Sequence, residues 1–368
     1  MFQILYKSKN NNARVGKIET SKGIIETPAF VFKTYNLQKS LNEETLKNIN
    51  IQIIKTDAFE LWKILSDEGI NFSTGIYDIL KWQKPIITDS GSLEILKLKE
   101  NNPKKNIIEI LNSGINFFDY QKRLEDYFDS EKSLKIQEEL NPNIITAFDL
   151  PIEWSENKNI VLEQTEKSHI WQTRFLEAKT SNQQVLAVLG GGIDNDLIEL
   201  SLRFLNKLSF DGLIINNFLK NPDAEKLIQI LKIVNQNYSE NKIKYIKNIQ
   251  SIQELFLFIE NGIDMFETEL PYKMAKNGFI WSLNQIINLN KNEYNNDNSI
   301  LDEFCDCLIC KQEKTKQEIN WQIKNKNPEG FKNLLTHNIY FLNKLTQEIR
   351  ESIKENKLKE LKKYYSQI

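Results

Sequence analysis

The chain has 368 residues, of which 40% are hydrophobic, 10% aromatic and 27% charged. This composition provides for a substantial core and excludes a disordered or fibrous protein, and the lack of any apolar run of about 18 residues argues against a membrane-spanning helix. A formal net charge of -2 excludes a surface that is basic throughout, so a nucleic acid would have to bind at a local positive patch. The first residues lack the long apolar segment of a signal peptide, and we expect a cytoplasmic protein with reduced cysteines.

The first predicted element is a β-hairpin formed by residues 15–20 and 23–28. After it, short apolar runs alternate with stretches of helical periodicity. The predicted strands are residues 29–32, 51–56, 85–88, 143–148, 185–189, 212–215, 242–246 and 263–266. The predicted helices are residues 42–48, 58–65, 130–140, 160–178, 196–208, 224–235 and 252–261.

Eight strands alternating with helices favour an α/β fold in which a parallel sheet closes into a (β/α)8 TIM barrel. No Gly-x-Gly-x-x-Gly follows the first strand, so the nucleotide fingerprint of an open sheet is absent. We expect residues 1–280 to form the barrel, preceded by the hairpin. Residues 281–368 are expected to form an appended subdomain that ends in a helix over residues 338–365.

Acidic residues recur directly after the predicted strands, at Asp57, Asp89, Asp149 and Glu267. In a barrel the carboxyl ends of all strands meet at one mouth, where this fold places its chemistry. Taken singly, each acid is explained as well by a carboxylate that caps a loop or a helix. Four acids at the same relative place favour a functional site.

Two of these acids indicate a reaction type. Asp89 lies in a Thr-Asp-Ser-Gly turn, where the Ser90 hydroxyl and the backbone amides around Gly91 can hold its carboxylate, and Glu267 ends a late strand. A pair of carboxylates across a pocket can cleave a glycosidic bond, because one attacks the anomeric carbon while the other handles the proton of the leaving group. Spacing alone names no substrate.

A Cys-x-Cys-x2-Cys loop contains every cysteine of the chain. Cys305, Cys307 and Cys310 are followed by His337, one of only two histidines. Three thiolates and an imidazole form a tetrahedral ligand set that zinc prefers. Four protein ligands leave no position for a water molecule, so we predict one structural zinc ion per chain. The alternative is three reduced cysteines with a histidine near them by chance.

Several segments carry a specific pattern: Thr88-Asp89-Ser90-Gly91, Ala147-Phe148-Asp149, Gly190-Gly191, the Asn-Gly-Ile-Asp-Met-Phe of residues 261–266, Leu270-Pro271, Lys276-Asn277-Gly278, and the cysteine loop with His337. They stand in the order found in tRNA-guanine transglycosylases, which the chain resembles almost end to end. The resemblance implies a TIM barrel with a structural zinc subdomain. It also implies exchange of guanine at the anticodon wobble position of tRNA for a 7-deazaguanine (preQ1 or queuine, in queuosine biosynthesis) through a covalent enzyme–ribose intermediate.

The resemblance implies roles for matching residues. Asp89 would be the acid/base for the departing and arriving bases, Glu267 falls at the nucleophile, and Asp149 would grip the amino and ring N–H groups of the base. Lys273 and Lys276 would contact the anticodon loop. The remaining predicted base-binding positions are Ser90, Gly91, Leu189, Gly190, Asn217 and Lys247. The target base must leave its stack to reach the mouth.

Five changes depart from the family pattern, one of them at a pair of residues. Glu267 stands where the family has aspartate, and its extra methylene displaces the carboxylate by roughly 1.5 Å, which costs about a hundredfold where attack geometry is tight. The others are Leu93 for an aromatic ring that covers the base, Leu189 after Val188 where the family has a glutamine, Asn216-Asn217 for a glycine pair, and Lys247 for an apolar wall. These changes indicate altered or lost base recognition.

Three functions remain open. The first is base exchange on tRNA, the second a tRNA-binding partner subunit with little or no catalysis that pairs with an active paralogue, and the third base exchange on DNA or at another tRNA position. The resemblance implies a homodimer or heterodimer through the surface near the zinc subdomain, and no membrane partner. The basic stretch 354–363 is interpreted as a solvated face of a helix in preference to an RNA-binding site.

Overall fold

The computed structural model describes residues 1–34, 41, 45–46, 49–69, 75–120, 123–152, 157–216, 224–283 and 285–367. Eight parallel strands close into a barrel in the order β10-β11-β12-β13-β14-β4-β5-β6. They are β4 (Ala29–Lys33), β5 (Ile53–Asp57), β6 (Ile86–Asp89), β10 (Ile144–Thr146), β11 (Gln184–Val188), β12 (Gly212–Asn216), β13 (Ile243–Lys247) and β14 (Met265–Glu267). The predicted TIM barrel is confirmed.

The barrel strands are buried along almost their whole length, which explains why the sequence reveals them. β6, β10 and β14 have no exposed residue, and β11 and β12 are only partly exposed at one end. Strands of a parallel sheet are covered on both faces, so they read as continuous apolar runs and not as an alternation. All eight predicted strands coincide with an observed strand to within a few residues.

Helices follow the strands, and they include three that were not predicted, over Ile76–Ile79, Ser92–Asn101 and Leu270–Lys276. They are α3 (Ala58–Glu68), α4 (Ile76–Ile79), α5 (Ser92–Asn101), α6 (Ser130–Leu140), α7 (Lys158–Ala178), α8 (Asn195–Leu205), α9 (Ala224–Asn237), α10 (Ile252–Glu260) and α11 (Leu270–Lys276). Side-chain caps fix several starts: Asp129 accepts from the amide of Lys132, and Ser251 from that of Glu254. Most of the predicted helix 42–48 lies outside the described residues.

The chain divides into two compact units. The first comprises Met1–Phe2, Glu19–Ile24 and Lys55–Tyr245, and the second Gln3–Ile18, Ile25–Ile54 and Ile246–Ile368. The first unit therefore contains β6, β10, β11 and β12 with helices α3 to α9. The second contains β4, β14, α10, α11 and all that follows. The predicted boundary at residue 280 stays a prediction.

An antiparallel sheet in the first unit was not predicted. β7 (Ile107–Ile110), β8 (Gly114–Asp119) and β9 (Leu124–Asp129) form it between α5 and α6. β7 is apolar in three of its four residues, but it is largely exposed and so covers no core. The sheet is anchored through Phe117 and Phe128, whose rings meet that of Phe59 edge to face with centroids 5.5 Å away.

The N-terminal hairpin is confirmed, with an additional strand. β2 (Arg14–Thr20) and β3 (Gly23–Thr27) pair as predicted, and β1 (Phe2–Lys7) extends the sheet. In the second unit Arg14 binds the carboxylate of Asp264 at both oxygens, with Nε 2.8 Å from Oδ1 and Nη2 2.6 Å from Oδ2. Both side chains are buried, so this bidentate pair ties β2 to the residue that precedes β14.

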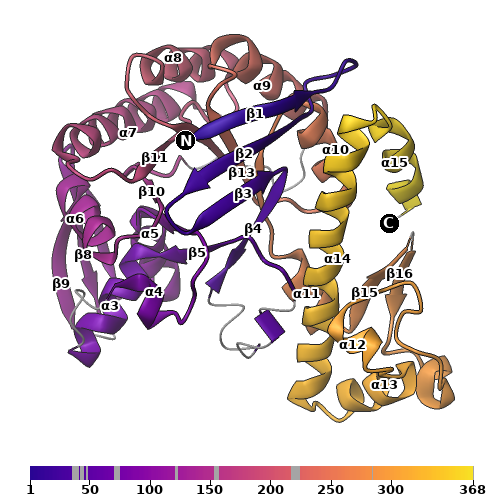
Figure 1. Ribbon diagram of the computed structural model, residues 1–368. Coiled ribbons are helices and arrows are strands. Elements are labelled where there is room, and N and C mark those ends of the chain that lie inside the picture. The colour runs from indigo at the N-terminus through magenta and orange to yellow at the C-terminus, as the bar shows by residue number, and fades with distance from the viewer. Residues whose placement is uncertain are drawn as a thin grey trace. The chain divides into compact units, whose positions relative to one another are not determined.

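The C-terminal part of the second unit is built on one long helix. α14 (Pro328–Lys354) contacts α11, α12 (Leu308–Lys311), α13 (Lys316–Lys324) and β15 (Phe279–Ser282), which pairs with β16 (Gln285–Asn288) (Figure 1). The remaining elements are η2 (Asn292–Asn296), α15 (Leu358–Tyr364) and η3 (Tyr365–Gln367). Among the described residues no helix has the length and apolarity to cross a membrane.

The prediction of one helix over residues 338–365 was wrong at its start and in its continuity. The helix begins ten residues earlier because the Asn327 side chain accepts from the amide of Glu329 and Pro328 occupies the first turn. It ends at Lys354 because Asn356 takes a positive φ of 57°, and α15 follows.

Candidate active site and metal centre

The three cysteines and His337 converge in the second unit. Their ligand atoms all lie within 4.8 Å of one another. Nδ1 of His337 lies 3.6 Å from the sulfur of Cys307 and 3.6 Å from that of Cys310. A tetrahedral zinc ion with Zn–S of about 2.3 Å and Zn–N of about 2.0 to 2.1 Å requires an S···N edge of about 3.6 Å. The residues therefore fit a metal ion of this size and geometry.

The surroundings orient His337 as a ligand. Nε2 lies 2.7 Å from the carbonyl oxygen of Trp281, so this nitrogen carries the proton and Nδ1 presents its lone pair to the sulfurs. Hydrogen bonds from Cys305 and then Cys310 lower the pKa of Cys307 to about 4, whereas contacts with Cys305 and Cys307 raise the pKa of Cys310. Ionisation of Cys307 thus opposes ionisation of Cys310, and a cation between them would relieve this opposition.

Asp89 ends β6 in the first unit and is paired with a buried lysine. Nζ of Lys55, from the middle of β5, lies 2.5 Å from Oδ2 of Asp89, and both residues are buried. A buried ammonium that donates to a carboxylate favours the ionised form of both groups. The sequence did not lead us to this partner. The signal was present, however, because a lysine within the apolar run Ile53–Asp57 requires a carboxylate nearby.

The turn after Asp89 brings two hydroxyls to Asp149. Oγ of Ser92 lies 3.2 Å and Oγ of Ser90 3.4 Å from Oδ1 of Asp149, and all three residues are buried. Gly91 makes this turn possible, because its φ is +90° and a Cβ there would lie 2.5 Å from Cβ of Phe59. The structure therefore brings the predicted residues Asp89, Ser90, Gly91 and Asp149 together, and adds Ser92.

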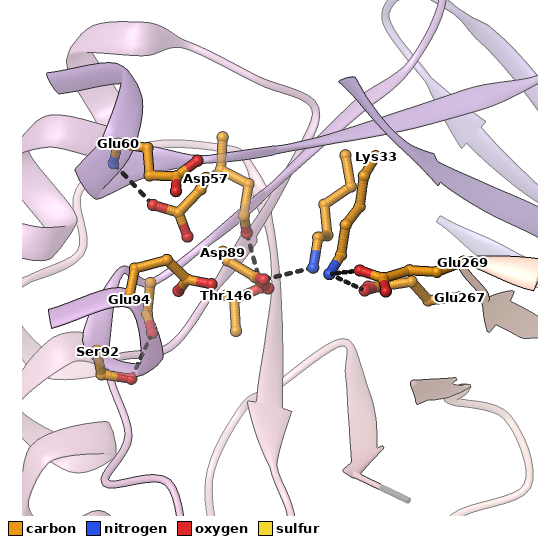
Figure 2. Close-up of polar contacts among 12 residues, drawn as sticks. Lys33, Asp57, Glu60, Asp89, Ser92, Glu94, Thr146, Glu267 and Glu269 are labelled. Atoms are coloured by element: carbon orange, nitrogen blue, oxygen red, sulfur yellow. Dashed lines mark hydrogen bonds and ion pairs between the residues drawn. The ribbon is translucent and has the colours of Figure 1, made fainter. Parts of the chain in front are cut away.

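Asp57 forms a carboxyl pair with Glu94. Oδ1 of Asp57 accepts from the amide of Glu60 and caps α3, which confirms the capping alternative for this one acid. Oδ2 of Asp57 and Oε2 of Glu94 are buried and have no hydrogen-bond partner among the described residues. The carboxylates of Asp57, Glu94 and Asp89 lie within 4.8 Å of one another (Figure 2). Burial, then Glu94 and Asp89, raise the pKa of Asp57 well above its usual value.

Replacing Asp57 with asparagine is expected to make folding less sensitive to pH. A carboxyl whose pKa is raised by folding stabilises the protein below its unfolded pKa, and this stability is lost as the pH rises through the folded pKa, by about 1.4 kcal/mol per unit of difference. Asparagine caps helices as well as aspartate does. As the pH rises from 5 to 8, the free energy of unfolding of the variant should therefore increase relative to that of the unchanged chain. Urea denaturation at each pH measures this difference.

The matched control is Asp194→Asn, at the N-cap of α8. Burial raises the pKa of Asp194, but hydrogen bonds from the Leu197 amide and Lys158 together outweigh it, so the pKa is lowered. Its contribution is complete above the unfolded pKa of about 4 and is lost only as the pH falls below it, so between pH 5 and pH 8 the control should differ from the unchanged chain by a constant free energy of unfolding. Equal pH dependence of the two variants would contradict the protonated state of Asp57.

Glu267 ends β14 in the second unit and is also paired with a lysine. Nζ of Lys33, the last residue of the neighbouring β4, lies 3.3 Å from Oε1 of Glu267 and 3.1 Å from Oε1 of Glu269 (Figure 2). The helix that follows begins after Glu269, so Glu267 does not cap it. Lys33, like Lys55, was not predicted as a site residue. Its position at the end of an apolar strand is the same kind of signal, because such a lysine requires a carboxylate nearby.

The other predicted site residues differ in their surroundings. The amide of Leu189 donates to the carbonyl of Ile214 and that of Gly190 to Oγ of Ser201. Leu93 is 43% exposed, whereas Leu189 is buried. Lys247 ends β13 and is partly exposed, and Lys273 and Lys276 lie exposed in the last turn of α11. Asn217 lies outside the described residues.

Comparison with known proteins agrees with this geometry. The model of the family described as queuine tRNA-ribosyltransferase matches residues 9–367. The chain belongs to this family. Among curated relatives, the queuine tRNA-ribosyltransferase of Halothermothrix orenii is 30% identical over 363 residues, covering 98% of this chain and 95% of the relative. That of Fusobacterium nucleatum is 29% identical, covering 99% and 98%.

Membership of the queuine tRNA-ribosyltransferase family confirms the resemblance read from the sequence. The match spans both the strand ends that carry Asp89 and Glu267 and the cysteine loop with His337. The lysines that pair with the two acids belong to the same matched region.

Proposed function

We propose that the chain is a tRNA-guanine transglycosylase, which exchanges guanine at the anticodon wobble position for a 7-deazaguanine such as preQ1 or queuine. The observation that carries the proposal is that Asp89 and Glu267 end two strands, β6 and β14, of a parallel barrel in a chain of this family. The carboxyl ends of barrel strands are where this fold places its chemistry.

In the proposed reaction Glu267 is the nucleophile and Asp89 the acid/base. A carboxylate oxygen of Glu267 attacks C1′ of the ribose as the bond from C1′ to the base nitrogen breaks, and the electron pair leaves with the base. The departing guanine takes a proton at the Asp89–Lys55 pair. The incoming base returns a proton to that pair as its nitrogen attacks C1′, which releases the Glu267 carboxylate.

Base binding is assigned to the group around Asp149. Its carboxylate accepts hydrogen bonds only, so it suits the amino and ring N–H groups of a guanine-like base. The Ser90 and Ser92 hydroxyls, 3.4 and 3.2 Å from Oδ1, support its orientation. The further base-binding assignments are Gly91, Leu189, Gly190, Asn217 and Lys247, and Lys273 and Lys276 are assigned to the anticodon loop.

The metal ion is assigned as zinc, held by Cys305, Cys307, Cys310 and His337. Such an ion stabilises the fold around it, and with four protein ligands it has no free position for substrate. The reaction is therefore assigned entirely to side chains at the strand ends. We assign the chain to a homodimer, or a heterodimer with a paralogue, and to the cytoplasm, because tRNA is its proposed substrate.

A second candidate is a tRNA-binding subunit that supports an active paralogue. The observation that favours it is that Asp89 and Glu267 each lie against a lysine ammonium, at 2.5 and 3.3 Å. An ammonium stabilises a carboxylate and so weakens it as a nucleophile or a base. Exchange on DNA is a third candidate, which a comparison of anticodon stem-loops with duplex DNA tests directly.

The deciding experiment is capture of the covalent intermediate. The purified chain is mixed with tRNA and a 7-deazaguanine and denatured, and the adduct is sought by gel shift and mass spectrometry; incorporation of labelled guanine is measured in parallel. We expect an RNA–protein adduct and label in the tRNA. Absence of both, with retained tRNA binding and restored exchange on adding a paralogue, would establish the partner role instead.

A further inference from the structure

Four charged side chains of the second unit form a continuous series of ionic contacts. Nζ of Lys33 lies 3.3 Å from Oε1 of Glu267 and donates to Oε1 of Glu269 at 3.1 Å. The other oxygen of Glu269, Oε2, lies 3.6 Å from Nζ of Lys273. The series Glu267–Lys33–Glu269–Lys273 therefore alternates in sign, and Figure 2 shows Lys33 placed against both glutamates.

The series runs from a buried end to an exposed end. The side chain of Glu267 is 3% exposed, Lys33 30%, Glu269 38% and Lys273 65%. Glu269 thus connects a buried carboxylate, through Lys33, with an ammonium that a polyanion can reach. Burial raises the pKa of Glu269, but Lys33 and then Lys273 outweigh this, so its pKa is lowered and it stays ionised.

Attack on a ribose changes the charge at the buried end. When an oxygen of Glu267 bonds to C1′ and the bond to the base breaks, the carboxylate becomes a neutral ester and its negative charge leaves with the electron pair of the base. Lys33 then loses an anionic partner in a place where only part of its side chain reaches water. An ammonium left without a counter-ion in such a site is unfavourable.

We propose that Glu269 is a positioning residue that takes over the Lys33 ammonium as Glu267 becomes esterified. This rests on the proposed function, because it assigns a role beside the proposed nucleophile. Glu269 frees the Glu267 carboxylate for attack and then compensates the lysine during the intermediate. It does so without touching the substrate.

The exposed end couples this transfer to RNA binding. Lys273 contacts the oxygen of Glu269 that Lys33 does not use. A backbone phosphate that binds Lys273 withdraws its ammonium from Glu269, which then attracts Lys33 more strongly. Arrival of RNA therefore favours movement of Lys33 from Glu267 toward Glu269, and the nucleophile is freed when substrate is present.

Replacing Glu269 with glutamine tests the proposal, because the side chain keeps its shape but loses its charge. At saturating RNA we expect the single-turnover rate of covalent-complex formation to fall by about tenfold to a hundredfold, with KM for RNA within twofold. The rate falls because Lys33 then pairs with Glu267 alone and restrains the nucleophile, whereas RNA binding, and with it KM, does not depend on that pair. Adding Lys33→Met to Glu269→Gln should restore most of the rate, because the ammonium that restrains Glu267 is then absent.

The matched control is Glu293→Gln, which neutralises another surface glutamate of the second unit, 3.6 Å from Lys291. Its rate should equal that of the unchanged chain, and the thermal midpoints of all variants should agree within a few degrees. Equal rates for Glu269→Gln and the unchanged chain, or a double variant slower than Glu269→Gln, would overturn the inference alone. No covalent complex with the unchanged chain would overturn the proposed function and this inference with it.

Discussion

Replacing Cys310 with serine, or His337 with alanine, is expected to release the metal ion and unfold the packing of α12 and α13 against α14. His337 is fully buried, and Cys307 and Cys310 are nearly so. Without the ion, their lone pairs face one another with no partner that compensates them. Structural zinc contributes roughly 10 kcal/mol or more of folding free energy in small zinc peptides. We therefore expect a fall of many degrees in the thermal midpoint.

The measurement is metal content by mass spectrometry, followed by thermal denaturation and hydrogen exchange with and without a chelator. One zinc ion per unchanged chain is expected, with the loss of exchange protection greatest over residues 279–340. The control is Asp306→Asn, within the same loop but 68% exposed and paired at the surface with Lys344, 3.7 Å away. It should keep its zinc and its thermal midpoint. Full stability of a metal-free Cys310→Ser chain would refute the structural role.

The barrel and the cluster of three cysteines with His337 could be predicted because local sequence indicates them. Most barrel strands are buried, largely apolar runs bounded by polar residues, and such runs can be recognised without knowing which strands lie beside them. The cysteines are rare and closely spaced, so only His337 had to come from a distance. The start of α14 was missed although its signal, Asn327 before Pro328, is also local.

The partners of the acids could not be predicted from local sequence, because they come from other strands of the barrel. Lys33 and Glu269 are 236 residues apart and meet only because β4 and β14 are neighbours in the barrel. The sequence shows that a lysine in an apolar strand needs a partner, but it does not show which carboxylate supplies it. The β7–β9 sheet was missed although its strands are consecutive in the chain, because β7 is largely exposed and its apolar residues cover no core.

Replacing Glu267 with glutamine is expected to abolish covalent-complex formation and to lower base exchange by about a thousandfold or more, because an amide oxygen is a far weaker nucleophile than a carboxylate. The change preserves side-chain volume, and Glu267 is 3% exposed in a strand of the barrel, so the fold should tolerate it. The measurement is single-turnover adduct formation with tRNA, with tRNA affinity determined separately. The affinity of the variant for tRNA should remain within a fewfold of that of the unchanged chain.

Glu267→Asp separates charge from reach. Its carboxylate is withdrawn by roughly 1.5 Å, so the contact with Lys33 lengthens while the charge remains, and we expect the adduct to stay detectable with a rate that differs from that of the unchanged chain. A nucleophile at this position requires that the aspartate variant forms the adduct and that the glutamine variant does not. If the glutamine variant supported base exchange by an active paralogue as well as the unchanged chain does, Glu267 would serve only as the counter-ion of Lys33 in a binding subunit.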